Sequence, residues 1–200
     1  SLVGSDGMVY CRTDSGLSRI NISIKAVEEV FAYNWCGINS AKLKKLQFVE
    51  CSEESIILLG QTQLYSSNKN APKEFQIIEL TKAEKNPNAG KTILELYAHG
   101  IDDNISEAIS IFNMNNKDYF IEVVTRYDES IYNSDPSQMS NMDDREIETI
   151  QKNKNISNDI AMDIINGKGP DILINTSNYG QLNNPDYLVD LSPYVKDLDS

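Results

Sequence analysis

The chain has 200 residues, of which 40% are hydrophobic and 24% charged, and its formal net charge is −12 at pH 7. Residues 91–200 carry this whole excess, because residues 1–90 hold ten basic and ten acidic side chains. The acidic half argues against a nucleic-acid partner, since phosphate binding needs a basic surface. No apolar run reaches the roughly eighteen residues of a membrane-spanning helix, so the sequence predicts none.

The N-terminal part of the chain, up to about residue 85, predicts β structure, because short apolar or alternating runs are separated by turn residues. Its pattern partly repeats after about 48 residues, from Met8 to Ile56. A period of this size is typical of propeller blades, and a small meander sheet is the alternative. A loop with Trp35 and a basic patch lies between the two sets of strands. The expected strands are Met8–Cys11, Arg19–Ile24, Val27–Tyr33, Ile56–Leu59 and Phe75–Leu80, and the basic patch is Lys42, Lys44 and Lys45.

A linker is predicted at Lys85–Gly90, which contains two Asn, a Pro and a Gly. Beyond it strands and helices alternate, a pattern that predicts parallel strand pairing. We therefore expect two domains, residues 1–87 and residues 91–200. The expected elements of the second are strands at Thr92–Ala98, Tyr119–Val124 and Ile172–Ile174, helices at Ile105–Asn116 and Asp143–Asn166, and a long polar loop at Arg126–Met142.

Two further predictions concern the helices. The acidic residues at Asp102 and Asp103 are expected to cap the first helix. In the second, a break near Asn153 is considered, with Ser157 capping the later half. The buried face of this second helix is expected to consist of Ile147, Ile150, Ile160, Ile164 and Ile165.

The stretch around the last strand organises this half of the chain. Gly167 and Pro170 predict a helix end, because glycine tolerates positive φ and proline cannot continue a helix. The strand Ile172–Ile174 has no alternating polar residue, so we expect both of its faces to be buried in the middle of a sheet. The polar loop after it then lies at the carboxyl end of the strand, where open α/β sheets hold ligands.

The order of motifs from about Lys91 to Ser200 resembles the first lobe of the extracellular solute-binding proteins of ABC importers, in particular the sugar-binding group. The motifs that carry the resemblance are Gly-Lys-Gly-Pro-Asp at Gly167–Asp171, the following strand, Leu-Val-Asp-Leu-Ser-Pro-Tyr at Leu188–Tyr194, and the Phe-Asn helix ending at Phe112–Asn116. The resemblance implies an incomplete α/β periplasmic-binding-protein-like lobe behind an added β-rich, propeller-like region. It implies capture of a carbohydrate by hinge closure, without covalent chemistry, cofactor or metal.

The same resemblance implies ABC permease subunits as partners and an extracellular location. A lipid anchor on the outer face of the cell membrane would be the only membrane attachment, and we expect the targeting segment to have been removed. A ligand with negative charge is disfavoured by the −12 net charge, unless Arg126 or Lys168 forms a basic pocket.

The predicted ligand-binding residues follow two strand ends. His99 and Gly100 come after the first strand, and the second set is in the loop after Ile174. Sugar sites use amide and hydroxyl groups together with an aromatic ring that stacks on the sugar. The predicted set is His99, Gly100, Asn175, Thr176, Ser177 and Tyr179.

The sequence leaves two other classes of function open. The first is a surface interaction module, in which the β repeats bind a protein or a glycan. The second is a carbohydrate-active enzyme whose catalytic part is missing from this sequence. Catalysis by the residues present is disfavoured, because His99 is the only histidine and neither a G-x-S-x-G nor a phosphate-loop motif occurs. The three cysteines match no zinc pattern, and free thiols are expected, with a Cys11–Cys51 bridge as the alternative.

Overall fold

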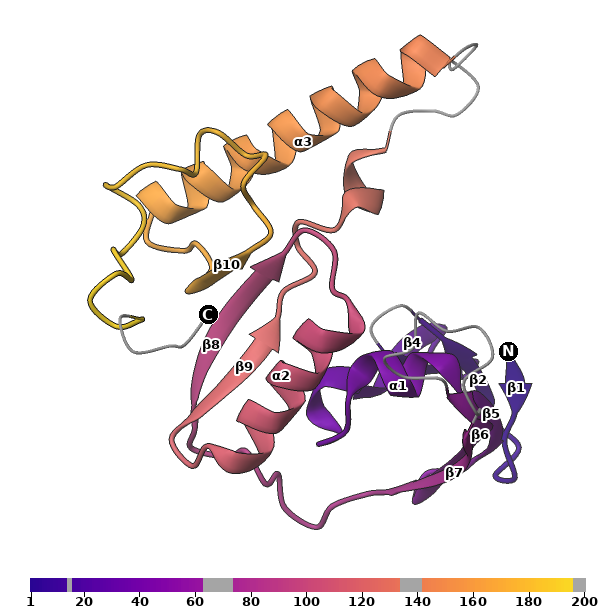
Figure 1. Ribbon diagram of the computed structural model, residues 1–200. Coiled ribbons are helices and arrows are strands. Elements are labelled where there is room, and N and C mark those ends of the chain that lie inside the picture. Colours follow the sequence, from indigo (N-terminus) through magenta and orange to yellow (C-terminus); the bar gives the residue numbers. More distant parts are fainter. Residues whose placement is uncertain (14–15, 63–73, 134–141, 196–200) are drawn as a thin grey trace. The chain divides into compact units, whose positions relative to one another are not determined.

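The computed structural model describes residues 1–13, 16–62, 74–133 and 142–195 (Figure 1). These residues have a mixed α/β structure, with antiparallel sheets and three α-helices. The contacts of the chain divide it into two compact units. Unit 1 is residues 1–93 and 101–122, and unit 2 is residues 94–100 and 123–200.

Unit 1 contains two antiparallel sheets in which consecutive strands are neighbours. The strands predicted from the sequence are present, but the one expected at Arg19–Ile24 ends at Asn21, because residues 22–25 form a turn. The Asn21 side chain accepts a hydrogen bond from Ile24 N, and Lys25 has a φ of 53°. The first sheet is β1 (Leu2–Val3), β2 (Val9–Arg12), β3 (Gly16–Asn21) and β4 (Ala26–Ala32), and the second is β5 (Gln47–Cys51), β6 (Ser55–Thr62) and β7 (Glu74–Thr81).

The segment between the two sheets, predicted as a loop, contains the short helix η1 (Tyr33–Trp35) and α1 (Ser40–Lys45). Asn39 caps α1, since its side chain accepts from Lys42 N at 3.2 Å. Arg12 closes the other end by donating to the carbonyls of Leu46, at 3.0 Å, and Lys44. These contacts satisfy backbone groups that a helix end leaves unpaired. The apolar core beneath consists of Tyr10, Leu17, Tyr33, Leu43, Leu46, Cys51, Ile56 and Leu58.

Helix α2 (Asp103–Asn115) starts as predicted, with the Asp102 side chain accepting from Ile105 N at 2.8 Å. It packs against α1 through Ser106, whose hydroxyl lies 2.9 Å from the Asn39 Oδ1. Near the other end of α2, the Asn113 side chain accepts from Ile121 N at 2.7 Å and donates to Ile121 O at 2.9 Å. The amide of Asn113 thus pairs with a strand backbone as a neighbouring strand would.

The three-stranded sheet has the order β10-β8-β9, formed by β8 (Thr92–Ala98), β9 (Tyr119–Val123) and β10 (Ile172–Ile174). Strands β8 and β10 pair in parallel, as predicted. The bonds from Thr92 N to Asp118 O and from Val124 N to Leu96 O advance in the same direction along both segments, which is the parallel arrangement. The prediction of a fully buried central strand at Ile172–Ile174 is wrong. Strand β10 is half-buried at the sheet edge, because a continuous aliphatic run does not tell an edge strand from a central one.

Helix α3 (Met142–Ile165) has no break. Ser157 is therefore a mid-helix residue and not a cap, and its buried hydroxyl finds no hydrogen-bond partner among the described residues. Ile156 and Ile160 are fully buried, but the predicted core residues Ile147, Ile150 and Ile165 are exposed. Ile147 and Ile165 each lie nine residues from Ile156, which is about two and a half turns, so they occupy the opposite side of the helix.

Other sequence predictions have simpler outcomes. The predicted linker at residues 85–90 is exposed along almost its whole length, while the domain boundary it implied stays a prediction. Part of the predicted polar loop, residues 134–141, is outside the described residues.

The three cysteines are free, and burial raises the pKa of the Cys36 thiol to about 12. In the described part of the chain, none of the helices combines the length and the apolar character needed to cross a membrane.

The pairing of Asn113 with Ile121 gives a stability prediction. Asn113→Ala leaves a buried N–H and a buried C=O of β9 unpaired, so it is expected to lower the free energy of unfolding by about 2–4 kcal/mol. The matched control is Asn115→Ala on the same helix, whose exposed side chain donates to Ile111 O within that helix, with an expected change of about 0.5 kcal/mol or less. Urea unfolding measures the free energy of unfolding of both variants. Equal losses in Asn113→Ala and Asn115→Ala would contradict the pairing of Asn113 with Ile121.

Candidate functional site

The carboxyl ends of β8 and β10 lie side by side, because the parallel register pairs Ala98 with Ile174. The residues that follow are therefore also neighbours. His99 N donates to Ile174 O at 3.0 Å, and Asn175 Nδ2 lies 3.5 Å from Gly100 O. The structure thus brings together residues from both predicted loops, and we call His99, Gly100, Asn175, Thr176, Ser177 and Tyr179 the strand-end site.

Tyr179 holds the strand-end site together from inside. Its hydroxyl lies 2.9 Å from His99 Nδ1 and 3.1 Å from the Tyr97 hydroxyl. Its ring stacks on Tyr97, with centroids 6.3 Å apart and planes 21° from parallel, and meets the His99 ring edge to face. Tyr179 is only 1% exposed, so in this structure its ring packs in the protein core and is not open to a sugar.

The other members of the site differ in exposure. A turn closed by the bond from Tyr179 N to Thr176 O, 2.9 Å, directs the loop after β10 back into the protein. Gly100, Asn175 and Ser177 are exposed, whereas Thr176 and His99 are half-buried. The Asn175 backbone has a φ of 58°, a conformation that asparagine adopts more readily than most residues. The groups that a solute can reach without rearrangement are therefore the Asn175 amide, the Ser177 hydroxyl and part of the imidazole.

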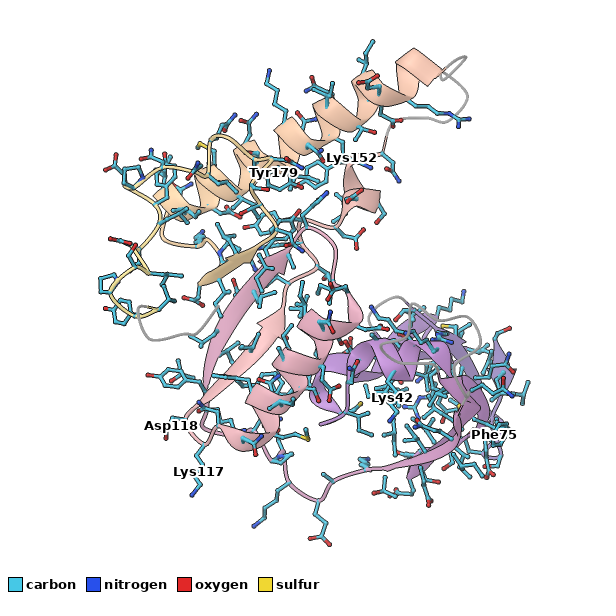
Figure 2. The ribbon with its side chains drawn as sticks, in the orientation of Figure 1. Lys42, Phe75, Lys117, Asp118, Lys152 and Tyr179 are labelled. Carbon is cyan, nitrogen blue, oxygen red and sulfur yellow. The ribbon has the colours of Figure 1, made fainter. Side chains whose placement is uncertain are left out.

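Glu129 and Lys152 extend this network, and the sequence did not predict either. Glu129 Oε1 lies 3.5 Å from His99 Nδ1, and Glu129 Oε2 lies 2.9 Å from Lys152 Nζ. Glu129 comes from the short helix η2 (Glu129–Tyr132) and Lys152 from α3. Figure 2 labels Lys152 and Tyr179, and the Tyr179 ring belongs to the cluster that packs on Ile156 and Ile160 of α3.

The segment with η2 is fastened to α3 by two tyrosines, another pairing that the sequence did not indicate. The Tyr127 hydroxyl donates to Asp163 Oδ2 at 2.5 Å, and the Tyr132 hydroxyl donates to Asp159 Oδ2 at 2.7 Å. The two acceptors are one helical turn apart on the same side of α3, so each of the two phenols reaches one carboxylate. This fixes the position of Glu129 beside His99.

Arg126 is already engaged by acidic groups. Its guanidinium donates to Glu95 at 2.5 Å and to Lys168 O at 3.0 Å, and it lies 3.9 Å from Asp163. It also covers the Tyr127 ring, 4.8 Å from the centroid. The pKa of Arg126 is raised, chiefly by its hydrogen bond to Glu95. Arg126 was one of the two residues considered for a basic pocket, and here its charge is neutralised within the protein.

Burial and hydrogen bonding keep four phenols of unit 2 neutral, those of Tyr97, Tyr127, Tyr132 and Tyr179. Burial is the largest cause in each case, and it raises the pKa of Tyr127 to about 12, with a further contribution from the hydrogen bond to Asp163. The pKa values of Tyr97, Tyr132 and Tyr179 are raised as well, and burial is again the main cause. At neutral pH these residues therefore act as hydrogen-bond donors and acceptors, not as anions.

Among the described residues, no group of three or more His, Cys, Asp and Glu side chains has the geometry to hold a metal ion. Comparison with known proteins gives no relative from which a role could be transferred. No family model, no curated protein and no solved structure matches this chain. The chemistry of the site therefore has to be argued from its own residues.

The raised phenol pKa values predict a loss of stability in alkali. The folded protein holds these protons more tightly than the unfolded chain, whose phenols ionise near 10.0. The stabilisation is therefore complete below about pH 10 and is lost as the pH rises through about 12. The melting temperature should fall steadily between about pH 10 and about pH 12, and less steeply in Tyr127→Phe.

Tyr119→Phe is the matched control, since the Tyr119 side chain is exposed on β9. The melting temperature of Tyr119→Phe should fall with pH as steeply as that of the wild-type protein. If Tyr127→Phe and Tyr119→Phe lose melting temperature with pH at the same rate, the buried phenols do not hold their protons as described.

Proposed function

We propose that this protein captures a neutral, hydroxyl-rich solute at the strand-end site, as an extracellular binding protein of an ABC importer. The observation that carries the proposal is the meeting of two polar loops at the carboxyl ends of the parallel strands β8 and β10. Ligands of open α/β sheets bind at such strand ends. The solute-binding lobe inferred from the motifs near Gly167 and Leu188 places its ligand at the same kind of edge.

The donor and acceptor set suits a carbohydrate. The Asn175 amide both donates and accepts, the Ser177 hydroxyl does the same, and the imidazole of His99 offers a nitrogen whose position is set by Tyr179. Each of these groups can pair with a sugar hydroxyl without a charge having to be removed from water. Such neutral pairs give orientation and specificity at a low desolvation cost.

The charges around the site support a neutral ligand over an anionic one. Lys152, the basic side chain linked to His99 through Glu129, is paired with that carboxylate, and Arg126 is paired with Glu95. Asp159 and Asp163 add two further acidic groups that accept from tyrosines. An anionic solute would meet an excess of negative charge here, which lowers its affinity.

In this proposal Tyr179 positions the site and does not stack on the sugar. Its ring is covered by Tyr97 and His99, so a stacking role would require the loop after β10 to open. The remaining ligand contacts would come from a second lobe that closes by a hinge, as in the family that the motifs resemble. Lipid anchoring outside the cell and delivery to permease subunits belong to the same proposal.

A second function, a surface interaction module, is favoured by one feature of unit 1. Phe75 and Ile77 project from β7 and are 64% and 70% exposed. The register places Ile77 beside Leu59 of β6, so the outward face of this sheet carries an apolar row. Figure 2 labels Phe75 on this sheet. Packing of a further propeller-like blade, or of a protein partner, would cover such a row.

The experiment is a thermal melting screen of the protein against neutral mono- and oligosaccharides, with sugar phosphates as the anionic comparison. A ligand that binds only the folded state raises the melting temperature by mass action, and at about one hundred times Kd it adds about 2.7 kcal/mol. We expect a neutral sugar to give a concentration-dependent shift. The double variant Asn175→Ala/Ser177→Ala should weaken binding at least about tenfold, since it removes two hydrogen-bonding groups.

Because Asn175 and Ser177 are exposed, this double variant tests binding and leaves the core intact. A truncation of the buried Tyr179 would instead leave a cavity in the core. The control is Asn104→Ala, an exposed asparagine of α2 that is outside the site. If a sugar shifts the melting temperature equally in the double variant, the site is elsewhere. If no neutral sugar shifts it but sugar phosphates do, the proposed ligand class is wrong.

A further inference from the structure

The hairpin formed by β3 and β4 ends in a four-residue turn, Ile22–Lys25. Lys25 N donates to Ile22 O at 3.4 Å, and the Asn21 side chain accepts from Ile24 N. These bonds fix the turn from within, so its two isoleucines are not needed to hold it. A turn of this kind is ordinarily made of polar residues.

Instead, the end of this hairpin carries four aliphatic side chains, Ile20, Ile22, Ile24 and Val27, which we call the hairpin tip. Ile22, Ile24 and Val27 are 74%, 64% and 66% exposed. Ile20 pairs with Val27 across the two strands, so these two side chains lie together at the base of the turn. Single exposed aliphatic residues are normal, but four gathered at the end of one hairpin indicate an interaction site.

The charge that the hairpin tip itself carries is opposite in sign to the net charge of the whole chain. Lys25 is the only charged residue from Ile20 to Val27, and it is basic, whereas the protein as a whole has a net charge of −12. The next charges along the strands, Arg19 and Glu28, neutralise each other in an ion pair of 2.8 Å. The hairpin tip is thus apolar with one ammonium group and has no acidic side chain of its own.

We propose that the hairpin tip inserts into the interfacial region of a lipid bilayer. Ile22, Ile24 and Val27 would enter the boundary between headgroups and acyl chains, and Lys25 would pair with a lipid phosphate. Interfacial binding of this kind grows with the apolar area buried and with attraction between basic residues and phosphates. The inference does not depend on the proposed solute site, which uses other residues.

Lipid fits this surface better than a protein partner. A standard protein interface takes about 20 residues on each side, whereas the hairpin tip offers four aliphatic side chains on a narrow turn. A bilayer needs no matching surface, because its chains rearrange around whatever enters. Four aliphatic residues and one lysine give weak, reversible attachment, comparable to that of a single lipid chain.

The test is flotation or sedimentation of the full 200-residue chain with vesicles of phosphatidylcholine alone, and with about one quarter phosphatidylglycerol. We expect a measurable bound fraction at millimolar lipid. Ile22→Ser/Ile24→Ser should lower the partition coefficient at least about tenfold with both kinds of vesicle. Lys25→Glu should lower it further on the anionic vesicles than on the zwitterionic ones.

The matched control is Ile147→Ser/Ile150→Ser, which removes two isoleucines of α3 that are 65% and 61% exposed and should leave partitioning unchanged. Circular dichroism and melting temperature confirm that each variant is folded. The inference is overturned if the wild-type chain does not bind vesicles, or if both double variants bind as it does. It is also overturned if sedimentation velocity finds a dimer that only the hairpin-tip variant abolishes, since the hairpin tip would then be a protein interface.

Discussion

The contact between the Tyr97 and Tyr179 hydroxyls is the interaction on which the strand-end site depends. Strand β10 is short and half-buried, and the loop beyond it has no regular structure to fix it. Tyr179 anchors that loop by burying its ring against Tyr97 and by bonding His99. A stacked aromatic pair contributes about 0.5–1.5 kcal/mol beyond its buried area, and a neutral hydrogen bond about as much. Together these contacts hold Asn175 and Ser177 at the end of β8.

A comparable constraint organises unit 1. The cap of α1, Asn39, also accepts from the Ser106 hydroxyl of α2, so the residue that starts one helix is bonded to the next. The ring of Trp35 stacks on Phe120 of β9 with centroids 4.3 Å apart. The β-rich part of the chain is therefore joined to α2 and β9 by polar and aromatic contacts within one unit.

Local patterns predicted the strands and helices well, including β8, β10 and the cap at Asp102, because each is encoded within a few residues. Predictions that needed tertiary information were less successful. The aliphatic run of β10 could not reveal its edge position, and isoleucines at helical spacing could not reveal that Ile147 and Ile165 face away from Ile156. Parallel pairing was predicted, and in the structure the pairing of β8 with β10 brings the two loops of the site together. No sequence pattern indicated Glu129 or Lys152 as part of the site, because their proximity to His99 is set by the packing of η2 on α3.

The most direct measurement uses the fact that His99 is the only histidine, so its imidazole gives a single, unambiguous set of NMR signals. The ring nitrogens of uniformly ¹⁵N-labelled protein would be followed during titration with a neutral sugar that raises the melting temperature. The account predicts that the Nδ1 signal, which reports the bond to Tyr179, shifts in a saturable way, with the same Kd as the melting data. An unchanged imidazole at a saturating concentration of that sugar would contradict it, because the ligand would then bind away from the ends of β8 and β10.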